Sequence, residues 1–461
     1  MFVLIRMSTY LKDIFLQLVR LGIGCVNEND NVNLNLDSPL SVEDWQALEE
    51  LANEHGLLGV MLDGIEGLRL MGLGAYCPPK PVMLQLIGQV LQSEQQYAVQ
   101  EHAATEMALL LHQHGIRTYV LKGAVVAECY PKPKHRLSAD MDCFLVNDND
   151  NQGSLRSKSF ENLTENLSDS TLSADSKLYT LNSQQDIWER GNRVLEEQGF
   201  EVRRYFYKNS TVILPGLTVE NHRYLTPFRG NKRLKSLERL LQRLINENDN
   251  LNENDNHNGE GKAVNVNVSV KVEEKFGLGL TLASPKGRFE GTWLYRPPVM
   301  VSALFLIEHA YSHFLHEGLT WRLILDWQMF CRRHRQELDW QELEARVDEF
   351  GFRRFYDTFN VIGQEAFGSR IGELENSSSN FSRTTDSKRS TIDNKLKSKM
   401  LEDIWASLDV HETVTGLRGK LALTGNIWRA RWKYRLFSDI TWLQALWIQA
   451  KGVLFENNPK I

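Results

Sequence analysis

Cysteine is scarce in this chain. The 461 residues include five cysteines, with no Cys-x-x-Cys pair and no histidine at zinc-ligand spacing beside them: Cys25, Cys77, Cys129, Cys143 and Cys331. A disulfide-stapled scaffold or a zinc-ribbon site would need clustered or regularly spaced cysteines. We therefore predict reduced thiols, most of them buried.

Long apolar runs are also missing. The first 24 residues look apolar, but Arg6, Lys12, Asp13 and Arg20 interrupt them. Charges at this spacing leave no signal-peptide core and no segment long enough to span a bilayer. We expect a cytoplasmic protein with no membrane partner.

The chain also lacks an excess of positive charge. The chain has 53 Lys and Arg against 59 Asp and Glu, giving a formal net charge of -6. Nucleic-acid binding through bulk charge needs a basic face, so this class is disfavoured for the chain as a whole. An aromatic and basic tract at residues 429–435 fits either a local nucleic-acid platform or an amphipathic helix that docks on the rest of the protein.

The length favours two or three domains over a single core. Runs rich in Asn, Asp and Glu recur along the chain and carry no apolar residues to bury, so we predict that they are surface insertions. The predicted division is an N-terminal helical region at 1–115, a sheet-containing region at 116–230 with a polar insertion at about 147–185, a polar insertion and β-hairpin-like linker at 231–285, and a C-terminal helical region at 286–461 with an insertion at about 372–398.

Hydrophobic periodicity places the elements within these regions. Apolar residues at helical spacing predict helices over 41–72 and 81–114, with Ser41 as an N-cap and Gly115 as a stop. Alternating and β-branched segments predict strands over 116–123 and 137–146, a hairpin over 201–214 and a strand over 217–225. Residues 301–330 are predicted as a helix. The fold class is therefore α+β.

Two carboxylates on one strand carry the chemistry. Asp140 and Asp142 are two residues apart, so they project from the same face. Two acids on one face of a buried strand repel each other and are costly to desolvate, which favours a bound cation. Glu220, on a later strand, supplies a third candidate carboxylate, and His222 beside it fits either packing or the site. If repulsion dominates, replacing Asp140 or Asp142 by Asn should leave folding intact or improve it without metal.

These residues resemble the nucleotidyltransferase superfamily, in particular a group of bacterial proteins called the uncharacterised nucleotidyltransferase family. The resemblance rests on Leu121-Lys122-Gly123, on Arg136 followed by Asp140-Met141-Asp142, on Glu220-Asn221-His222, and on a His-bearing helix that continues to Arg322 and Asp326. It implies a palm like that of DNA polymerase beta, with a mixed β-sheet at residues 116–230 flanked by N- and C-terminal helical regions.

The resemblance also implies a reaction and a set of roles. A nucleoside monophosphate passes from an NTP to an acceptor hydroxyl, and pyrophosphate leaves. Two Mg²⁺ (or Mn²⁺) ions roughly 4 Å apart would be held by the catalytic carboxylates of Asp140, Asp142 and Glu220. The substrate-binding residues would be Lys122, Gly123, Arg136, His222, Arg322 and Asp326. The acceptor is a small molecule, a protein or a nucleic-acid end.

Other interpretations remain open. The wider superfamily has a Gly-Ser or Gly-Gly turn where this chain has Gly123-Ala124, so a catalytically inactive scaffold or nucleotide-binding protein is the alternative. His309 and His313, four apart, fit zinc binding, a phosphotransferase site or packing, and packing is favoured. Arg322 and Asp326 also fit an ordinary i,i+4 salt bridge.

Overall fold

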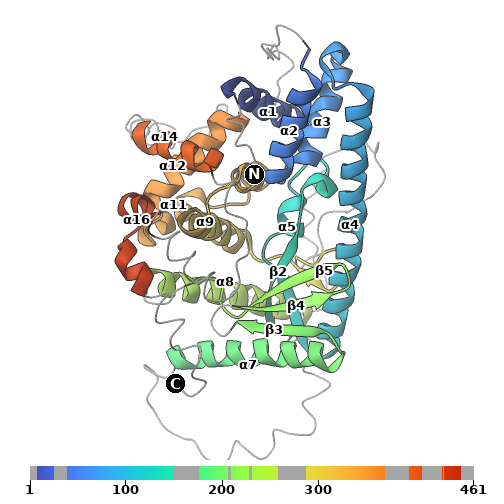
Figure 1. Ribbon diagram of the computed structural model, residues 1–461. Helices are drawn as coiled ribbons and strands as arrows, with labels where there is room; N and C mark the ends of the chain where they lie inside the picture. Colours follow the sequence, from blue (N-terminus) through green and yellow to red (C-terminus); the bar gives the residue numbers. More distant parts are fainter. Residues whose placement is uncertain are drawn as a thin grey trace, which may run out of the picture.

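The computed structural model describes residues 8–24, 39–148, 176–205, 209–227, 231–257, 287–368, 394–406, 428 and 430–447. Within these residues a mixed sheet is flanked by helices from both ends of the chain (Figure 1). The α+β architecture predicted from the sequence is therefore confirmed.

Four α-helices and one 3₁₀ helix precede the sheet in the described residues. They are α1 (Thr9–Gly22), α2 (Val42–Glu54), α3 (Leu58–Leu70), the 3₁₀ helix η1 (Gly74–Tyr76) and α4 (Lys80–Gln113). Ser41 caps α2 as predicted, because its hydroxyl accepts from the Asp44 N–H while the Asp44 carboxylate accepts from the Ser41 N–H. Helix α4 ends before Gly115, whose φ of 69° suits a residue without a Cβ. In Figure 1, α4 extends from the N-terminal helices to the sheet.

Among the described residues, the sheet has six strands in the order β3-β4-β5-β2-β1-β6. Their bounds are β1 (Ile116–Val120), β2 (Asp140–Asn147), β3 (Glu201–Tyr205), β4 (Asn209–Leu214), β5 (Leu217–His222) and β6 (Leu294–Tyr295). β2 pairs antiparallel with β1 and parallel with β5, and β3–β4 form the predicted antiparallel hairpin. The parallel pairing of β2 with β5 places residues of the Asp-x-Asp segment beside those of the Glu-x-His segment.

The two faces of the sheet have different coverings. Met141, Cys143 and Leu145 of β2 belong to a core that also contains residues of α4 and of α7 (Ser176–Glu197). Phe144 and Val146 alternate with them and belong to the second core, formed with helices from both ends of the chain. Since alternate residues of a strand share a face, Asp142 lies on the face of Phe144, toward the second core.

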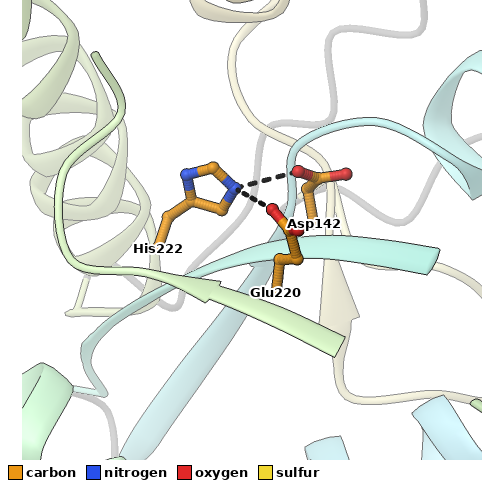
Figure 2. Close-up of side chains that lie close together, drawn as sticks. All are labelled: Asp142, Glu220 and His222. Atoms are coloured by element: carbon orange, nitrogen blue, oxygen red, sulfur yellow. Dashed lines mark hydrogen bonds and ion pairs between the residues drawn. The ribbon is translucent and has the colours of Figure 1, made fainter. Parts of the chain in front are cut away.

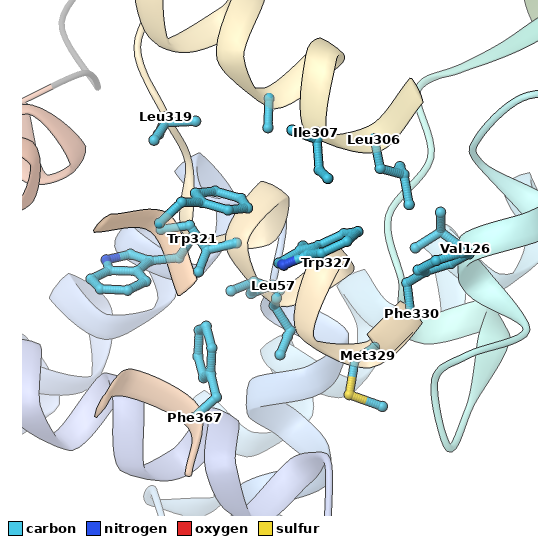
Figure 3. Packing of buried hydrophobic residues seen from close by; sticks show 14 of the residues in the cluster. Leu57, Val126, Leu306, Ile307, Leu319, Trp321, Trp327, Met329, Phe330 and Phe367 are labelled. Carbon is cyan, nitrogen blue, oxygen red and sulfur yellow. The ribbon is translucent and has the colours of Figure 1, made fainter. Parts of the chain in front are cut away.

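The second core joins the N-terminal and C-terminal helices. The latter are α9 (Val299–His316), α10 (Trp321–Arg333), α11 (Trp340–Glu349), α12 (Arg353–Phe367), α14 (Asn394–Ala406) and α16 (Arg431–Phe437). Trp321, Trp327 and Phe330 of α10 lie among Leu57, Val126 and other apolar residues in Figure 3. Each fully buried side chain of this size contributes roughly 1.5–3 kcal/mol. In the described part of the chain, no helix has the length and apolar character needed to cross a membrane.

Three segments differ from the sequence expectations. Residues 301–330 form two helices, because Gly318 has a φ of 106° and Thr320 caps α10. Helix α7 begins at Ser176, within the predicted insertion at about 147–185. Residues 231–257, predicted as insertion and hairpin-like linker, contain α8 (Lys232–His257). The first half of α8 buries leucines at helical spacing, which outweighs the poor helix propensity of the Asn/Asp-rich run.

The predicted insertions lie largely beyond the described residues. The run at 27–31, residues 149–175 and the part of the stretch at about 372–398 up to residue 393 fall there, as does Arg429, the first residue of the aromatic and basic tract. The end of that tract, residues 431–435, lies in α16, where Tyr434 is buried in the core. The described part of the tract thus fits the docking-helix interpretation.

Candidate active site

A compact polar group forms where β2 and β5 run side by side. Asp142 is paired in register with Glu220, and Phe144 with His222. Asp142, Glu220 and His222 each offer one ligand atom, and these atoms lie within 4.8 Å of one another. His222 Nε2 is 2.9 Å from Asp142 Oδ1 and 3.7 Å from Glu220 Oε2 (Figure 2). The parallel pairing thus brings together residues that are 78 and 80 positions apart in the chain.

The group is closed on one side and accessible on the other. The side chains of Asp142 and His222 are 1% and 0% exposed, whereas that of Glu220 is 35% exposed. Asn209 on β4 donates from its amide nitrogen to Glu220 Oε2 at 2.9 Å. Solvent therefore reaches this group at Glu220.

Lys122 supplies a cation to the buried end. Its Nζ lies 3.0 Å from Asp142 Oδ2 and 3.1 Å from His309 Nε2 on α9. Burial by itself raises the pKa of Asp142, but Lys122 and His222 outweigh this and hold that pKa well below its usual value. Asp142 is therefore an anion whose charge is balanced by neighbouring side chains.

Gly123 forms the turn that places Lys122. It has a φ of 72°, which L side chains rarely adopt, and a Cβ on it would lie 3.3 Å from Ser138 Oγ. It precedes the short helix α5 (Ala124–Ala127). Lys122 lies between this turn and the end of β1, the strand that pairs with β2.

Asp140 stands apart from this group. It begins β2 on the same face as Asp142, opposite Thr218, and is half-buried. Its carboxylate oxygens are not among the ligand atoms that lie within 4.8 Å of one another in the described residues. The metal-binding role predicted for Asp140 therefore stays a prediction, whereas Asp142 and Glu220 are brought together.

Arg136 and Asp326 form a buried ion pair before β2. Arg136 Nε donates to Asp326 Oδ1 at 2.9 Å and Nη2 donates to Oδ2 at 2.7 Å, and both side chains are at most 5% exposed. Tyr130 also donates to Asp326 Oδ1 at 2.7 Å. Burial by itself lowers the pKa of Arg136, but Asp326 raises it above its usual value. The guanidinium group of Arg136, which was predicted to bind substrate, is thus bound by the Asp326 carboxylate.

Arg322 lies beside this pair with a different partner. Its Nη1 donates to the Leu137 carbonyl oxygen at 2.6 Å, and burial and Arg136 lower its pKa. Asp326 pairs with Arg136, so the ordinary i,i+4 salt bridge considered for Arg322 and Asp326 is replaced by a contact between distant segments. The two arginines and Asp326 support the loop at residues 136–139 that leads into Asp140.

A buried carboxylate anchors the chain that leaves β5. Glu238 on α8 accepts from the backbone N–H groups of Leu225 and Thr226 at 3.1 and 2.7 Å, from the Thr226 hydroxyl and from the Gln242 amide. Burial raises its pKa to about 7 against the effect of these donors. No sequence pattern pointed to Glu238, which holds the backbone three residues beyond His222.

The group fits a divalent cation. Asp142 Oδ2 is buried and accepts no well-aligned hydrogen bond among the described residues, although Lys122 lies 3.0 Å away. An under-satisfied carboxylate oxygen beside a second carboxylate and an imidazole is a donor set suited to a metal ion. From the sequence, His222 fitted either packing or the site, and packing was the favoured interpretation for His309. The structure places both of them at the site, and His309 also stacks on Phe305.

One family model matches two segments of this chain. The family model described as uncharacterised nucleotidyltransferase matches residues 41–156 and 273–368. Lys122, Arg136 and the two aspartates lie in the first matched segment, and His309 lies in the second, whereas Glu220 and His222 lie between them.

No curated protein and no solved structure gives a significant match. The family match supports a nucleotidyltransferase activity in general, and the acidic group at β2 and β5 is a possible metal site. Across residues 41–156 and 273–368, the chain is similar to the uncharacterised nucleotidyltransferase family.

Proposed function

We propose that this protein transfers a nucleoside monophosphate from an NTP to an acceptor hydroxyl in a metal-dependent reaction. The observation that carries the proposal is the convergence of Asp142, Glu220 and His222 on one point in a chain that matches a nucleotidyltransferase family. The acceptor oxygen attacks the α-phosphorus, the bond from that phosphorus to the β-phosphate oxygen breaks, and pyrophosphate leaves with the electron pair.

Asp142 and Glu220 are the residues that would hold the ion, with Asp140 as a further candidate carboxylate. A bound divalent ion such as Mg²⁺ or Mn²⁺ would neutralise phosphate charge and lower the pKa of the attacking hydroxyl. The partly exposed Glu220 side of the group is where the acceptor would enter and where its proton would leave to water.

Lys122 supplies the second element of the mechanism. Its ammonium group already lies beside Asp142 and its side chain is 16% exposed, so the ammonium group can turn toward a phosphate without leaving the site. For Arg136 we propose a role other than the substrate binding expected from the sequence. Because Asp326 engages two of its guanidinium nitrogens, we assign Arg136 to holding the loop before Asp140. Arg322 is the further cation proposed for phosphate contact.

The proposal is tested with NTPs labelled at either the α- or the γ-phosphate, incubated with the full chain, Mg²⁺ or Mn²⁺ and fractionated cell lysate. Nucleotidyl transfer places the α-label in a product and the γ-label in pyrophosphate. Transfer of the γ-label to the product would identify a phosphotransferase instead. Binding of NTP without any transfer in any fraction would favour the inactive nucleotide-binding alternative.

Asp142→Asn is the test variant and Asp13→Asn is its matched control, because Asp13 is an exposed carboxylate on α1, outside the site. We expect transfer to be lost in the first variant and kept in the second. Equal transfer by both variants would remove Asp142 from the mechanism.

A further inference from the structure

The position of the His222 ring raises the question of which ion the site takes. The ring is completely buried, and its Nε2 faces Asp142 Oδ1 at 2.9 Å and Glu220 Oε2 at 3.7 Å. Its other nitrogen, Nδ1, lies 3.4 Å from the Tyr224 carbonyl oxygen. In the neutral ring, these contacts allow two positions of the single ring proton.

The first arrangement places the proton on Nε2, which then donates to Asp142. In the second, Nδ1–H points at the Tyr224 carbonyl, and Nε2 presents a lone pair to two carboxylate oxygens. Three acceptors that face one another are stable only with a cation between them. A histidine whose remote nitrogen is directed at a backbone carbonyl is also the usual second-sphere arrangement of a metal-bound imidazole.

The distances agree with a shared ion. Ligand atoms at about 2.0–2.2 Å from one ion lie about 3 Å apart when they occupy adjacent positions. The observed separations of 2.9 and 3.7 Å bracket this value. Small rotations of the Glu220 side chain, which is partly exposed, would bring its oxygen to that spacing.

We infer that His222 is a metal ligand together with Asp142 and Glu220, and that the site consequently prefers a divalent transition-metal ion over Mg²⁺. Mg²⁺ selects oxygen ligands, whereas first-row transition ions accept imidazole. The inference concerns the metal of the proposed nucleotidyltransferase site. The use of the metal in catalysis rests on the proposed function, whereas the identity of the ligands does not. Binding of the metal alone can be measured without turnover.

Mn²⁺ is the appropriate probe because it binds most weakly in the first-row series, which makes the comparison with Mg²⁺ conservative. Titration of the full chain with Mn²⁺ alone and Mg²⁺ alone should give affinities that differ by about tenfold or more. The variant His222→Asn, which offers oxygen in place of nitrogen, should lose most of this preference. The matched control His102→Asn, which replaces an exposed histidine on α4, should keep it.

A measurement on the unaltered protein covers the case in which His222→Asn fails to fold. Pulsed electron paramagnetic resonance of bound Mn²⁺ should show coupling to a nitrogen-14 nucleus. The signal should persist in His309→Gln, which removes the other nearby imidazole. Bound Mn²⁺ without nitrogen coupling, or equal affinity for Mn²⁺ and Mg²⁺, would overturn the inference.

The outcomes separate the two proposals. Nitrogen coupling without nucleotidyl transfer would keep the ligand assignment and reject the function. Transfer with Mg²⁺ and an oxygen-only ion site would keep the function and reject the role of His222.

Discussion

Replacing Asp142 by Asn separates two opposing effects in the metal-free protein. From the sequence alone, the loss of one of two repelling carboxylates was expected to leave folding intact or improve it. In the structure, Asp142 contacts Lys122 at 3.0 Å and His222 at 2.9 Å, so attraction replaces repulsion as the main interaction. Asparagine keeps the size but removes the charge that balances Lys122.

The magnitude follows from these contacts. Two unit charges 3.0 Å apart attract by about 5.5 kcal/mol at an effective dielectric of about 20, before desolvation is subtracted. Lys122 is 16% exposed and keeps His309 as a partner, so part of the loss is recovered. We expect Asp142→Asn to lower the free energy of unfolding by about 2–3 kcal/mol in chelator.

Urea unfolding in excess chelator, followed by circular dichroism, measures this difference against Asp13→Asn. The control should lie within about 0.5 kcal/mol of the unaltered protein, because it changes an exposed side chain. An Asp142→Asn variant as stable as the control, or more stable, would show that repulsion among the carboxylates outweighs the contact with Lys122.

Three further predictions concern neighbouring charges. Lys122→Met should raise the affinity for Mn²⁺ in the absence of NTP, because the substitution removes a competing cation beside Asp142. The same variant should lower the rate of nucleotidyl transfer. Calorimetric titration that shows weaker Mn²⁺ binding by the variant would contradict this prediction. Arg136→Ala should lower the free energy of unfolding by about 3–5 kcal/mol in urea, because it leaves Asp326 buried and unpaired, and an unchanged midpoint would refute the structural role. Because the pKa of Glu238 is raised to about 7 in the folded state, its contribution to stability is present below the unfolded value and is lost as pH rises through about 7. Glu238→Gln should therefore reduce the fall in unfolding free energy between pH 5 and pH 8, which unfolding curves across that range would detect.

Local sequence patterns predicted the elements that carry the site. The alternation in residues 140–147 and 217–222 specified two strands, and the Asp-x-Asp and Glu-x-His spacings specified which face each side chain would take. The mixed sheet holding residues about 116–146 and 200–225 is confirmed, with β6 as an added edge strand. The division into domains stays a prediction, although helices from both ends of the chain share one core.

Contacts between distant segments could not be predicted from local sequence patterns. Nothing local indicates that Asp326 pairs with Arg136, 190 positions away, when Arg322 stands one helical turn before it. The contact of His309 with Lys122 depends in the same way on how α9 packs against the sheet. The break at Gly318 was missed because apolar periodicity continues on both sides of it, and the left-handed backbone is visible only in the structure.

Glu220 offers the most direct test of the central claim that the group at β2 and β5 is a nucleotidyltransferase centre. Its side chain is 35% exposed, so Glu220→Gln should fold normally, and Glu201→Gln on β3 is a matched change of an exposed strand carboxylate. The measurement is the rate of α-label transfer from NTP at saturating Mn²⁺ for these two variants. We predict a loss of about 100-fold or more for Glu220→Gln and an unchanged rate for Glu201→Gln. Equal rates for the two variants would contradict the account.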